Sequence, residues 1–298
     1  MKKNIFIFSS PLQFLFSSLI VSQLKHNIYC VGYYYVYHKD FTKVYEMISN
    51  FLGNRMSEIR PVKDFKVEEV NFKDSVFFSN RYSLTEIDLF YKCKKYTENL
   101  YLYEEGFNTY LKHHFNDPKK SEYLLLNNIK NSVKQNLLNR LPNLIRFKQF
   151  KGVFTTFEID HLKEKEKWHP IKFISRENII KKEIGSCLFL SQSLVGDNLV
   201  SKNDFLSFLN VYFNKIGSIY DVIYFKPHPR DNKDLINEIL SSNIKVKLLT
   251  LNENDLPAEI FLMKRPMDVI GFSSSTLIYA NSLFKINSYE CLKELVDY

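Results

Sequence analysis

The chain has 298 residues, and its 41 lysines and arginines exceed its 33 aspartates and glutamates, which gives a formal net charge of +8 at pH 7. Hydrophobic residues make up 45% of it, with only 8 glycines and 9 prolines, so the composition excludes low-complexity and fibrous proteins and predicts two globular domains. The basic balance favours an anionic partner, such as a nucleotide, an acidic polysaccharide or an anionic lipid surface. No block of basic residues interleaved with aromatic ones occurs, so we expect no nucleic-acid partner.

The cysteines and the amino-terminal sequence predict the cellular compartment of the protein. Four cysteines lie far apart, without a C-x-x-C pair or a histidine at metal-ligand spacing, which predicts reduced thiols, a cytoplasmic protein and no metal. The apolar run Ile5–Phe8 stops at Ser9-Ser10-Pro11, and no run approaches the about 18 apolar residues of a membrane span. We expect neither a signal peptide nor a transmembrane helix.

Strand-like and helix-like segments alternate along the first half. A strand over Asn4–Phe8 leads through a Ser-Ser-Pro cap into a helix. An unassigned stretch, 56–76, interrupts the pattern. The expected elements are strands over Asn4–Phe8, Ile28–Tyr37, Asn99–Tyr103 and Gly152–Thr156, and helices over Leu12–Leu24, Phe41–Phe51, within Phe77–Lys95 and within Ser121–Phe150.

A charged run over 161–167, followed by Trp168-His169-Pro170, breaks the periodicity, so we place a domain boundary between residues 165 and 166. The predicted domains are 1–165 and 166–298. In the second, we expect strands over Ser186–Leu190, Asp221–Phe225, Ile244–Leu249, Pro266–Phe272 and Phe284–Ile286, and helices over Lys202–Ile216, Asp234–Ser241 and Ser275–Leu283. This alternation predicts an α/β protein with two doubly wound, Rossmann-like domains facing a central cleft.

Three polar segments follow predicted strands: Glu104-Glu105-Gly106, Lys226-Pro227-His228-Pro229-Arg230 and Ser273-Ser274-Ser275. In open α/β sheets, ligands bind outside the carboxyl ends of the strands. We therefore expect the three segments to contribute to one site.

The acidic pair offers a general base. Two adjacent carboxylates repel each other, which raises the pKa of at least one and lets it accept a proton from an attacking hydroxyl. Gly106 would let the backbone turn sharply. An exposed acidic turn is the alternative interpretation of this segment.

The other two segments suit a phosphate. Pro227 and Pro229 fix the backbone around His228, whose pKa would rise against a phosphate so that it could donate a proton to a leaving group. Lys226 and Arg230 would add positive charge, although a histidine in a rigid surface turn is the alternative. The three serines lie at the start of a predicted helix. Capping of the helix would explain one serine, and an anion-binding site would explain why there are three.

Two motifs are absent from the sequence. No D-x-D carboxylate pair and no glycine-rich phosphate loop occurs, which disfavours metal-dependent nucleotide-diphosphate enzymes, P-loop NTPases and nicotinamide dehydrogenases. A nucleotide with few phosphates, held without a metal, fits better.

The order of these motifs, an acidic pair with glycine, then His-Pro, then a serine cluster, resembles the bacterial sialyltransferases, most of all glycosyltransferase family 52, the lipooligosaccharide sialyltransferases. The run Leu188-Phe189-Leu190-Ser191 is similar to the strand and loop that open the second domain of these enzymes. The resemblance implies a GT-B-type fold, a CMP-activated nonulosonic acid donor, and metal-independent transfer with inversion and no cofactor.

The resemblance also implies roles. His228 is the general acid or phosphate stabiliser, Ser273, Ser274 and Ser275 hold the CMP phosphate, and Glu105 or Glu104 is the base. The remaining donor-site candidates are Lys226, Pro229, Arg230, Ser191 and Gln192, and the acceptor-site candidates are Ser9, Ser10, Gln13, Gly106 and Asn108. Loops over 81–85 and 107–110 would add acceptor specificity. The chain departs from its relatives in having Glu-Glu where they often have Asp, and in having Ser191-Gln192-Ser193 where some carry a base.

The sequence thus predicts transfer of sialic acid from CMP-sialic acid to a terminal sugar, such as galactose, of a lipooligosaccharide or capsular glycan. The acceptor could be lipid-linked, with the enzyme peripheral at the inner face of the cytoplasmic membrane. The alternatives are another CMP-nonulosonic acid, a UDP- or GDP-sugar, or a non-catalytic protein that binds a glycan, a nucleotide or nucleic acid. Formation of a homodimer is left open.

Overall fold

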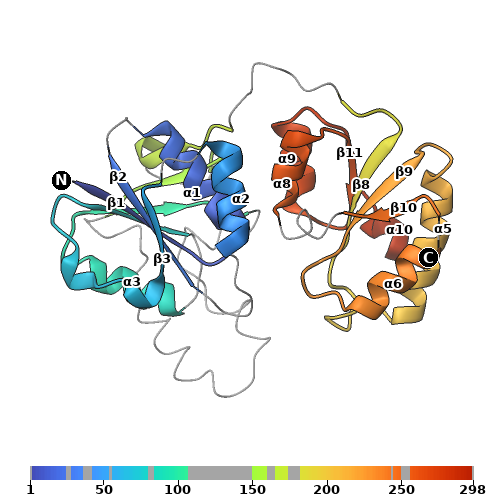
Figure 1. The fold of residues 1–298 in the computed structure, drawn as a ribbon, viewed down its shortest axis with the longest axis horizontal. Helices are drawn as coiled ribbons and strands as arrows, with labels where there is room; N and C mark the ends of the chain where they lie inside the picture. Colours follow the sequence, from blue (N-terminus) through green and yellow to red (C-terminus); the bar gives the residue numbers. More distant parts are fainter. Residues whose placement is uncertain are drawn as a thin grey trace. The chain divides into compact units, whose positions relative to one another are not determined.

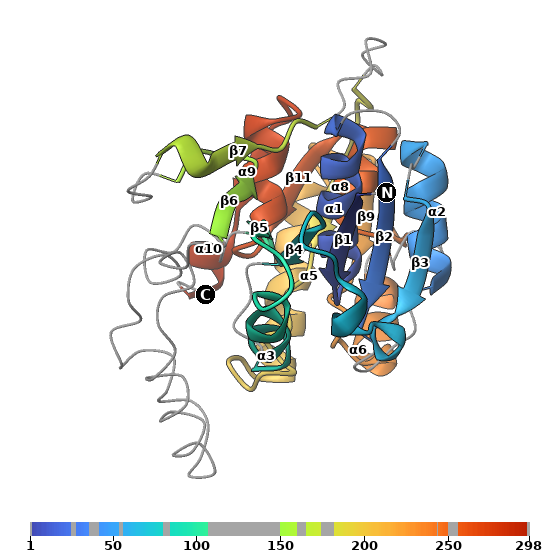
Figure 2. The ribbon, with the colours of Figure 1, turned by 90° about the vertical axis from the view of Figure 1, so that its left-hand side faces the viewer.

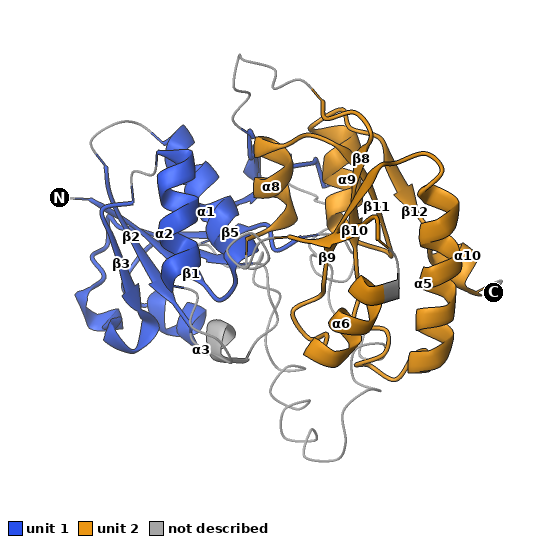
Figure 3. Ribbon diagram, turned by 45° about the vertical axis from the view of Figure 1, so that its right-hand side comes forward, with its two compact units in different colours: residues 1–174 blue, residues 175–298 orange. Residues whose placement is uncertain are grey.

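The computed structural model describes residues 2–24, 28–35, 42–53, 56–79, 84–106, 150–159, 165–173, 182–242, 244–249 and 256–296. The chain divides into two compact units, residues 1–174 and 175–298 (Figure 3). Both are α/β units, as the sequence predicts.

The first unit is built on a parallel sheet in the order β3-β2-β1-β4-β5-β6-β7 (Figure 2). Its α-helices are α1 (Pro11–Gln23), α2 (Thr42–Leu52) and α3 (Leu84–Cys93). Short 3₁₀ turns occupy Val62–Asp64, Val67–Glu69 and Lys165–Lys167. The strands are β1 (Lys3–Phe8), β2 (Tyr29–Tyr34), β3 (Glu58–Pro61), β4 (Ser75–Ser79), β5 (Asn99–Tyr103), β6 (Phe150–Thr155) and β7 (Trp168–Pro170).

The domain boundary lies later than predicted, because β7 belongs to the first sheet. Val153 of β6 pairs with Trp168 of β7. The Trp168 indole N–H donates to the Thr155 hydroxyl at 2.8 Å, and its ring packs against the core of the first unit. These contacts keep the segment after the charged run with the first unit, so the two units divide after residue 174 and not at 165.

Two strands of the first unit were not predicted from the sequence. The unassigned stretch 56–76 contains β3 and the start of β4, which continues to Ser79, whereas the helix predicted within Phe77–Lys95 is confirmed as α3. The short β3 carries Arg60 and Pro61 and is partly exposed, so it has little of the apolar signal of a buried strand. The helix predicted within Ser121–Phe150 lies outside the described residues, apart from Phe150, which begins β6.

The second unit has a smaller parallel sheet in the order β10-β9-β8-β11-β12. Its strands are β8 (Ser186–Leu190), β9 (Val222–Lys226), β10 (Val246–Leu248), β11 (Asp268–Gly271) and β12 (Ser288–Glu290). Its helices are α5 (Lys202–Ile216), α6 (Lys233–Ser242), α8 (Ala258–Lys264), α9 (Ser275–Ser282) and α10 (Leu292–Val296), labelled in Figure 1.

The predicted strand over Phe284–Ile286 is wrong. The N–H groups of Phe284 and Ile286 donate to the carbonyls of Tyr279 and Ala280, so this segment closes the end of α9. Lys285 has a φ of 55°, a left-handed conformation that a strand does not contain. The last strand is β12, and α8 and α10 complete the unit.

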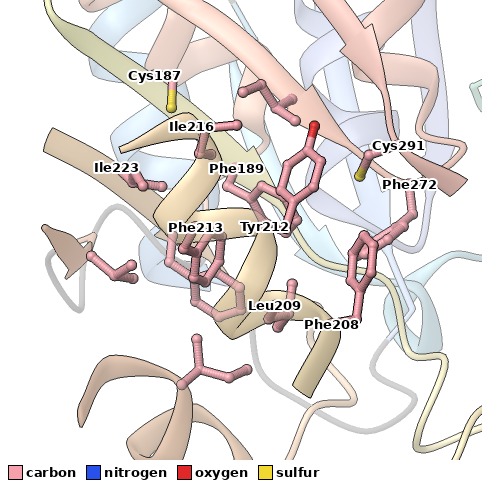
Figure 4. Packing of buried hydrophobic residues seen from close by; sticks show 14 of the residues in the cluster. Cys187, Phe189, Phe208, Leu209, Tyr212, Phe213, Ile216, Ile223, Phe272 and Cys291 are labelled. Atoms are coloured by element: carbon pink, nitrogen blue, oxygen red, sulfur yellow. The ribbon is translucent and has the colours of Figure 1, made fainter. Parts of the chain in front are cut away.

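Aromatic side chains dominate the core of the second unit. Phe189 of β8 packs edge-on against Phe213 of α5, with ring centroids 5.0 Å apart, and against Phe272 after β11 (Figure 4). Cys187 and Cys291 are buried in the same cluster, and burial raises the pKa of each thiol to about 12. All four cysteines are free and buried, as the sequence predicts.

Strand order reverses once in each sheet. In the first sheet the chain passes β1, β2 and β3 and then returns to the other side of β1 with β4; in the second it returns to the other side of β8 with β11. At such a reversal, the two neighbouring loops leave the carboxyl edge in opposite directions and open a crevice for ligands. The residues that follow β1 and β4, and those that follow β8 and β11, are therefore the structural candidates for binding.

Candidate functional site

The first turn of α1 is fixed by three of the predicted acceptor residues. The Ser10 hydroxyl caps the helix by accepting the N–H of Gln13 at 3.3 Å, with Pro11 in the first helical position. The buried Gln13 carboxamide oxygen accepts both the N–H and the hydroxyl of Ser9, at 2.6 and 3.0 Å. Gln13 and Ser9 are buried and hold the turn, so Ser10 is the member of the three that is accessible at this edge.

The two glutamates of the acidic pair lie in different environments. Glu104 is completely buried, and its carboxylate accepts the N–H of Thr156 at 2.6 Å, while its own N–H donates to the carbonyl of Phe154. It therefore joins the ends of β5 and β6. Glu105 is partly exposed, and Gly106 after it has a φ of 122°, which favours glycine and confirms the predicted sharp turn. Of the two, Glu105 is the carboxylate that a substrate can reach.

One predicted acceptor residue and parts of two predicted acceptor loops cannot be placed. Asn108 and the loops over 81–83 and 107–110 lie outside the described residues. Ser10, Glu105 and Gly106 thus remain the accessible or turn-forming candidates at the carboxyl edge of the first sheet.

His228 lies in a tight turn after β9. Its backbone N–H donates to the Asp231 carboxylate at 2.8 Å, and its ring Nδ1 accepts the N–H of Arg230 at 3.2 Å. Because Nδ1 acts as an acceptor, the proton of the neutral ring is on Nε2. The turn therefore presents a single ring donor, Nε2–H.

The surroundings of His228 favour its neutral form. Burial of the imidazole is the largest cause that lowers its pKa, and the positive charges of Arg230 and Lys226 lower it further. The negative charges of Asp231 and Asp197 raise the pKa in part. The rise in pKa that the sequence predicts therefore depends on a phosphate, because the protein by itself shifts the pKa down. Burial also raises the pKa of Asp231, although hydrogen bonds from the His228 N–H and the Ser191 hydroxyl lower it in part.

The two basic residues of the segment differ in accessibility. Arg230 is largely exposed and forms an ion pair of 2.6 Å with Asp197, in the loop after β8, so its charge is already compensated. Lys226 ends β9, and its carbonyl accepts the N–H of Ser191 at 3.0 Å. This hydrogen bond holds the predicted donor-site loop, Ser191 with Gln192, beside the His228 turn; Pro229 is exposed at its outer side.

The three serines take three separate positions. Ser274 caps α9 by accepting the N–H of Thr276 at 3.3 Å, and Ser275 is the first residue of that helix. Ser273 is exposed, with a φ of 27°, and its N–H donates to Glu290 at 3.4 Å. One serine is thus explained by capping, and the other two are at the amino terminus of α9, whose dipole favours an anion.

Two carboxylates beside this edge were not predicted from the sequence. Asp231 fixes the His228 turn. Glu259, in the first turn of α8, is buried, and its Oε1 accepts the hydroxyl of Thr276 at 2.8 Å. Burial raises the pKa of Glu259, while the Thr276 hydroxyl and the charge of Lys226 lower it. The hydrogen bond from Thr276 connects α8 with α9. The sequence signal for Glu259 is a single carboxylate within the apolar run Ala258–Leu262.

The second unit brings two of the three predicted segments to one edge. The His228 turn, the Ser191 loop and the serines follow β9, β8 and β11, which are neighbours in the sheet. Neighbouring strands are about 4.8 Å apart, so the outer two of these exits are about 10 Å apart. The acidic pair follows β5 of the other sheet. Among the described residues, no group of three or more His, Cys, Asp or Glu side chains is arranged to hold a metal ion.

Comparison with known proteins gives both a family and a fold. A family model described as "Alpha-2,8-polysialyltransferase (POLYST)" matches residues 2–293. No curated protein was found to match the sequence.

Solved structures of nucleotide-sugar enzymes are similar over nearly the whole chain. The co-structure of S. aureus MnaA with UDP has a TM-score of 0.55 and 12% identity, covering 97% of this chain and 78% of that chain. UDP-GlcNAc 2-epimerase from Neisseria meningitidis, bound to UDP-GlcNAc, has a TM-score of 0.56 and 10% identity, covering 99% of this chain and 85% of that chain. The Methanocaldococcus jannaschii UDP-GlcNAc 2-epimerase in complex with UDP-GlcNAc and UDP has a TM-score of 0.56 and 16% sequence identity. The match covers 99% of this chain and 86% of that chain. At this identity the similarity shows the fold, which is the predicted GT-B type with two Rossmann-like domains.

Proposed function

The chain belongs to the alpha-2,8-polysialyltransferase family, and from this premise we propose that it transfers sialic acid from CMP-sialic acid to the end of a surface glycan. The prediction of a sialyltransferase from the motifs is confirmed at this level, and as a glycosyltransferase the protein binds a nucleotide-sugar donor and a glycan acceptor. Membership of glycosyltransferase family 52 stays a prediction. The name of the matched family favours a sialic acid residue as the acceptor, and terminal galactose is the alternative that the motifs suggested.

The observation that carries the proposal is the geometry of His228. Its Nδ1 is occupied by the N–H of Arg230, so Nε2–H is the donor left for a ligand at the carboxyl edge of the second sheet. We assign this donor to the phosphate of CMP. The α9 amino terminus, with Ser273 and Ser275, supplies further donors and a positive dipole two strands away. Together with Lys226, these groups would stabilise the charge that develops on departing CMP.

The proposed reaction is a single displacement. The acceptor hydroxyl oxygen forms a bond to the anomeric carbon of sialic acid, while the bond from that carbon to the phosphate oxygen of CMP breaks. Glu105 takes the hydroxyl proton. If His228 has taken up a proton on Nδ1, which releases the N–H of Arg230, it donates its Nε2 proton to the phosphate and returns to the neutral ring; the neutral ring donates only a hydrogen bond from Nε2. One displacement inverts the anomeric centre. We propose that no metal is needed, because histidine, lysine and a helix dipole provide the positive charge at the phosphate.

A direct assay tests this function. The protein is incubated with CMP-sialic acid and either an α2,8-linked oligosialic acid or a galactose-terminated oligosaccharide, and CMP is measured. We expect CMP release that depends on the acceptor and is unchanged by a metal chelator. Parallel reactions contain another CMP-nonulosonic acid, a UDP-sugar or a GDP-sugar. Absence of transfer from all these donors would contradict the proposal and favour a non-catalytic binding protein.

Binding of CMP is expected to be accompanied by uptake of a proton at His228. In the free protein the pKa of His228 is lowered, so the ring is neutral near pH 7. A bound phosphate favours the charged ring and raises the pKa. The affinity for CMP should therefore increase as the pH falls from the raised, bound pKa towards the lowered, free pKa.

Calorimetric titration in two buffers of different ionisation enthalpy measures this proton uptake. The matched control is His228→Gln, which keeps an N–H donor but does not titrate; any uptake by the CMP phosphate itself persists in it. Equal proton uptake in both proteins would show that His228 does not face the phosphate.

We further propose that the enzyme works at the inner face of the cytoplasmic membrane on a lipid-linked acceptor. The net charge of +8 supports contact with an anionic leaflet. Among the helices of the described residues, none is long and apolar enough to cross a bilayer.

A further inference from the structure

The amino edge of the first sheet carries a group of exposed aromatic and basic side chains. Phe72 is 62% exposed and Tyr96 38% exposed, although both are large apolar rings. Lys2, Lys73 and Lys95 are exposed beside them. These five residues, called the amino-edge patch below, precede β1, β4 and β5, which are neighbours in the sheet.

Strand pairing brings the three segments of the patch to one edge. Asn4 of β1 pairs with Ser75 of β4, and Ser75 pairs with Asn99 of β5, so the residues that precede these strands lie at the same edge of the sheet. The side chains of Thr97 and Asn99 both donate to the carbonyl of Phe72, at 3.3 and 3.4 Å. These bonds hold the turn before β4 against the turn before β5. Neighbouring strands are about 4.8 Å apart, so the aromatic pair and the lysines form one small surface.

The three segments that carry the patch have a net positive charge. The segments 2–3, 71–74 and 94–98 contain five lysines and two carboxylates, Asp74 and Glu98. Asp74 is buried and accepts the N–H groups of Lys3 and Asn71, at 2.8 and 2.9 Å, so its role is to fix the turn. The exposed surface of these three segments is thus basic, with two aromatic rings among the lysines.

We infer that the amino-edge patch is where the protein binds an anionic membrane surface. Lysines attract anionic headgroups, and aromatic side chains enter the boundary between headgroups and acyl chains. A second copy of this chain is disfavoured as the occupant, because two apolar side chains fall far short of the about 800 Å² per partner that a standard interface buries. Binding that relied on phosphate alone would leave the exposure of Phe72 unexplained.

This inference rests on the proposed function in one respect: a lipid-linked acceptor is the reason why the protein would bind a membrane. The patch is at the amino edge of the first sheet, whereas Glu105 and Ser10 follow strands at its carboxyl edge. Strands of five or six residues are about 17–20 Å long, so substitutions in the patch do not touch the groups assigned to catalysis.

Sedimentation of the full chain with vesicles tests the patch, using phosphatidylcholine alone or mixed with phosphatidylglycerol. We expect binding to the mixed vesicles that weakens as salt is added. The variant Lys73→Gln/Lys95→Gln should bind about 25-fold more weakly, from about fivefold for each lysine. Phe72→Ser should also lower the affinity while the charge is unchanged.

Matched controls make the same chemical changes on the second unit. Lys233→Gln/Lys247→Gln removes two exposed lysines, and Val211→Ser removes a side chain that is 54% exposed. The expected result is a loss of vesicle binding in the patch variants that exceeds the loss in these controls. Equal binding by patch and control variants would overturn the inference, as would a Phe72→Ser variant that changes only the oligomeric state or only nucleic-acid binding.

Transfer to a soluble acceptor should be unchanged in every variant. Vesicle binding is measurable even if no transfer occurs, so failure of the membrane inference can be told apart from failure of the proposed function.

Discussion

Replacing His228 with alanine is expected to lower the rate of sialic acid transfer by about 100- to 10,000-fold, the range over which a general acid acts. The ring has one donor for a ligand, Nε2–H, because Nδ1 accepts the N–H of Arg230. Alanine removes that donor and leaves the charge on departing CMP without its proton source. Turnover with saturating CMP-sialic acid and acceptor measures the effect, and acceptor binding should be largely unchanged.

The variant His228→Gln separates two functions of the imidazole. Glutamine can place an N–H near the position of Nε2, but it cannot transfer a proton at neutral pH. If His228 acts mainly by hydrogen bonding to the phosphate, glutamine should restore much of the activity lost in the alanine variant; if it acts as an acid, both variants should be similarly slow. An alanine variant with the activity of the parent would contradict any role for His228 at the phosphate.

Replacing Glu105 with glutamine is expected to slow transfer by a similar factor, about 100- to 10,000-fold, with little change in thermal stability. The amide has almost the shape of the carboxylate but cannot accept the proton of the acceptor hydroxyl. Glu105 is partly exposed at the end of β5, so its replacement should not disturb the core. Rate assays, together with thermal unfolding and CMP binding, measure the three consequences.

The neighbouring Glu104 provides the matched comparison. Its buried carboxylate accepts the N–H of Thr156, so Glu104→Ala should lower the free energy of unfolding by about 1–3 kcal/mol. We therefore expect the main defect of one variant to be catalytic and that of the other to be structural. The opposite result, a Glu104→Ala variant that is stable but inactive together with an active Glu105→Gln variant, would assign the base to Glu104.

Long apolar and amphipathic segments could be predicted from the sequence because their local pattern agrees with their final environment. The strand over Asn4–Phe8, the helix Lys202–Ile216 and its Ser201 cap all match β1 and α5 within one residue. Elements whose local signal is weak could not. The strand β3 is partly exposed and contains proline, and the segment Phe284–Ile286 is as apolar as a strand, although its N–H groups donate to carbonyls of α9.

For the site, the sequence by itself determined the residue types and their place along the chain: a carboxylate pair, a proline-framed histidine and serines, each directly after an apolar run. Only the tertiary structure decided what each of them does, because burial and hydrogen bonding depend on segments distant in the sequence. Glu104 and Glu105 are chemically identical neighbours, yet Thr156 of the adjacent strand binds one and leaves the other partly exposed. The pKa of His228 is lowered because the fold buries the ring and places positive charge beside it, and Glu259 joins the edge only because α8 packs beside Thr276 of α9.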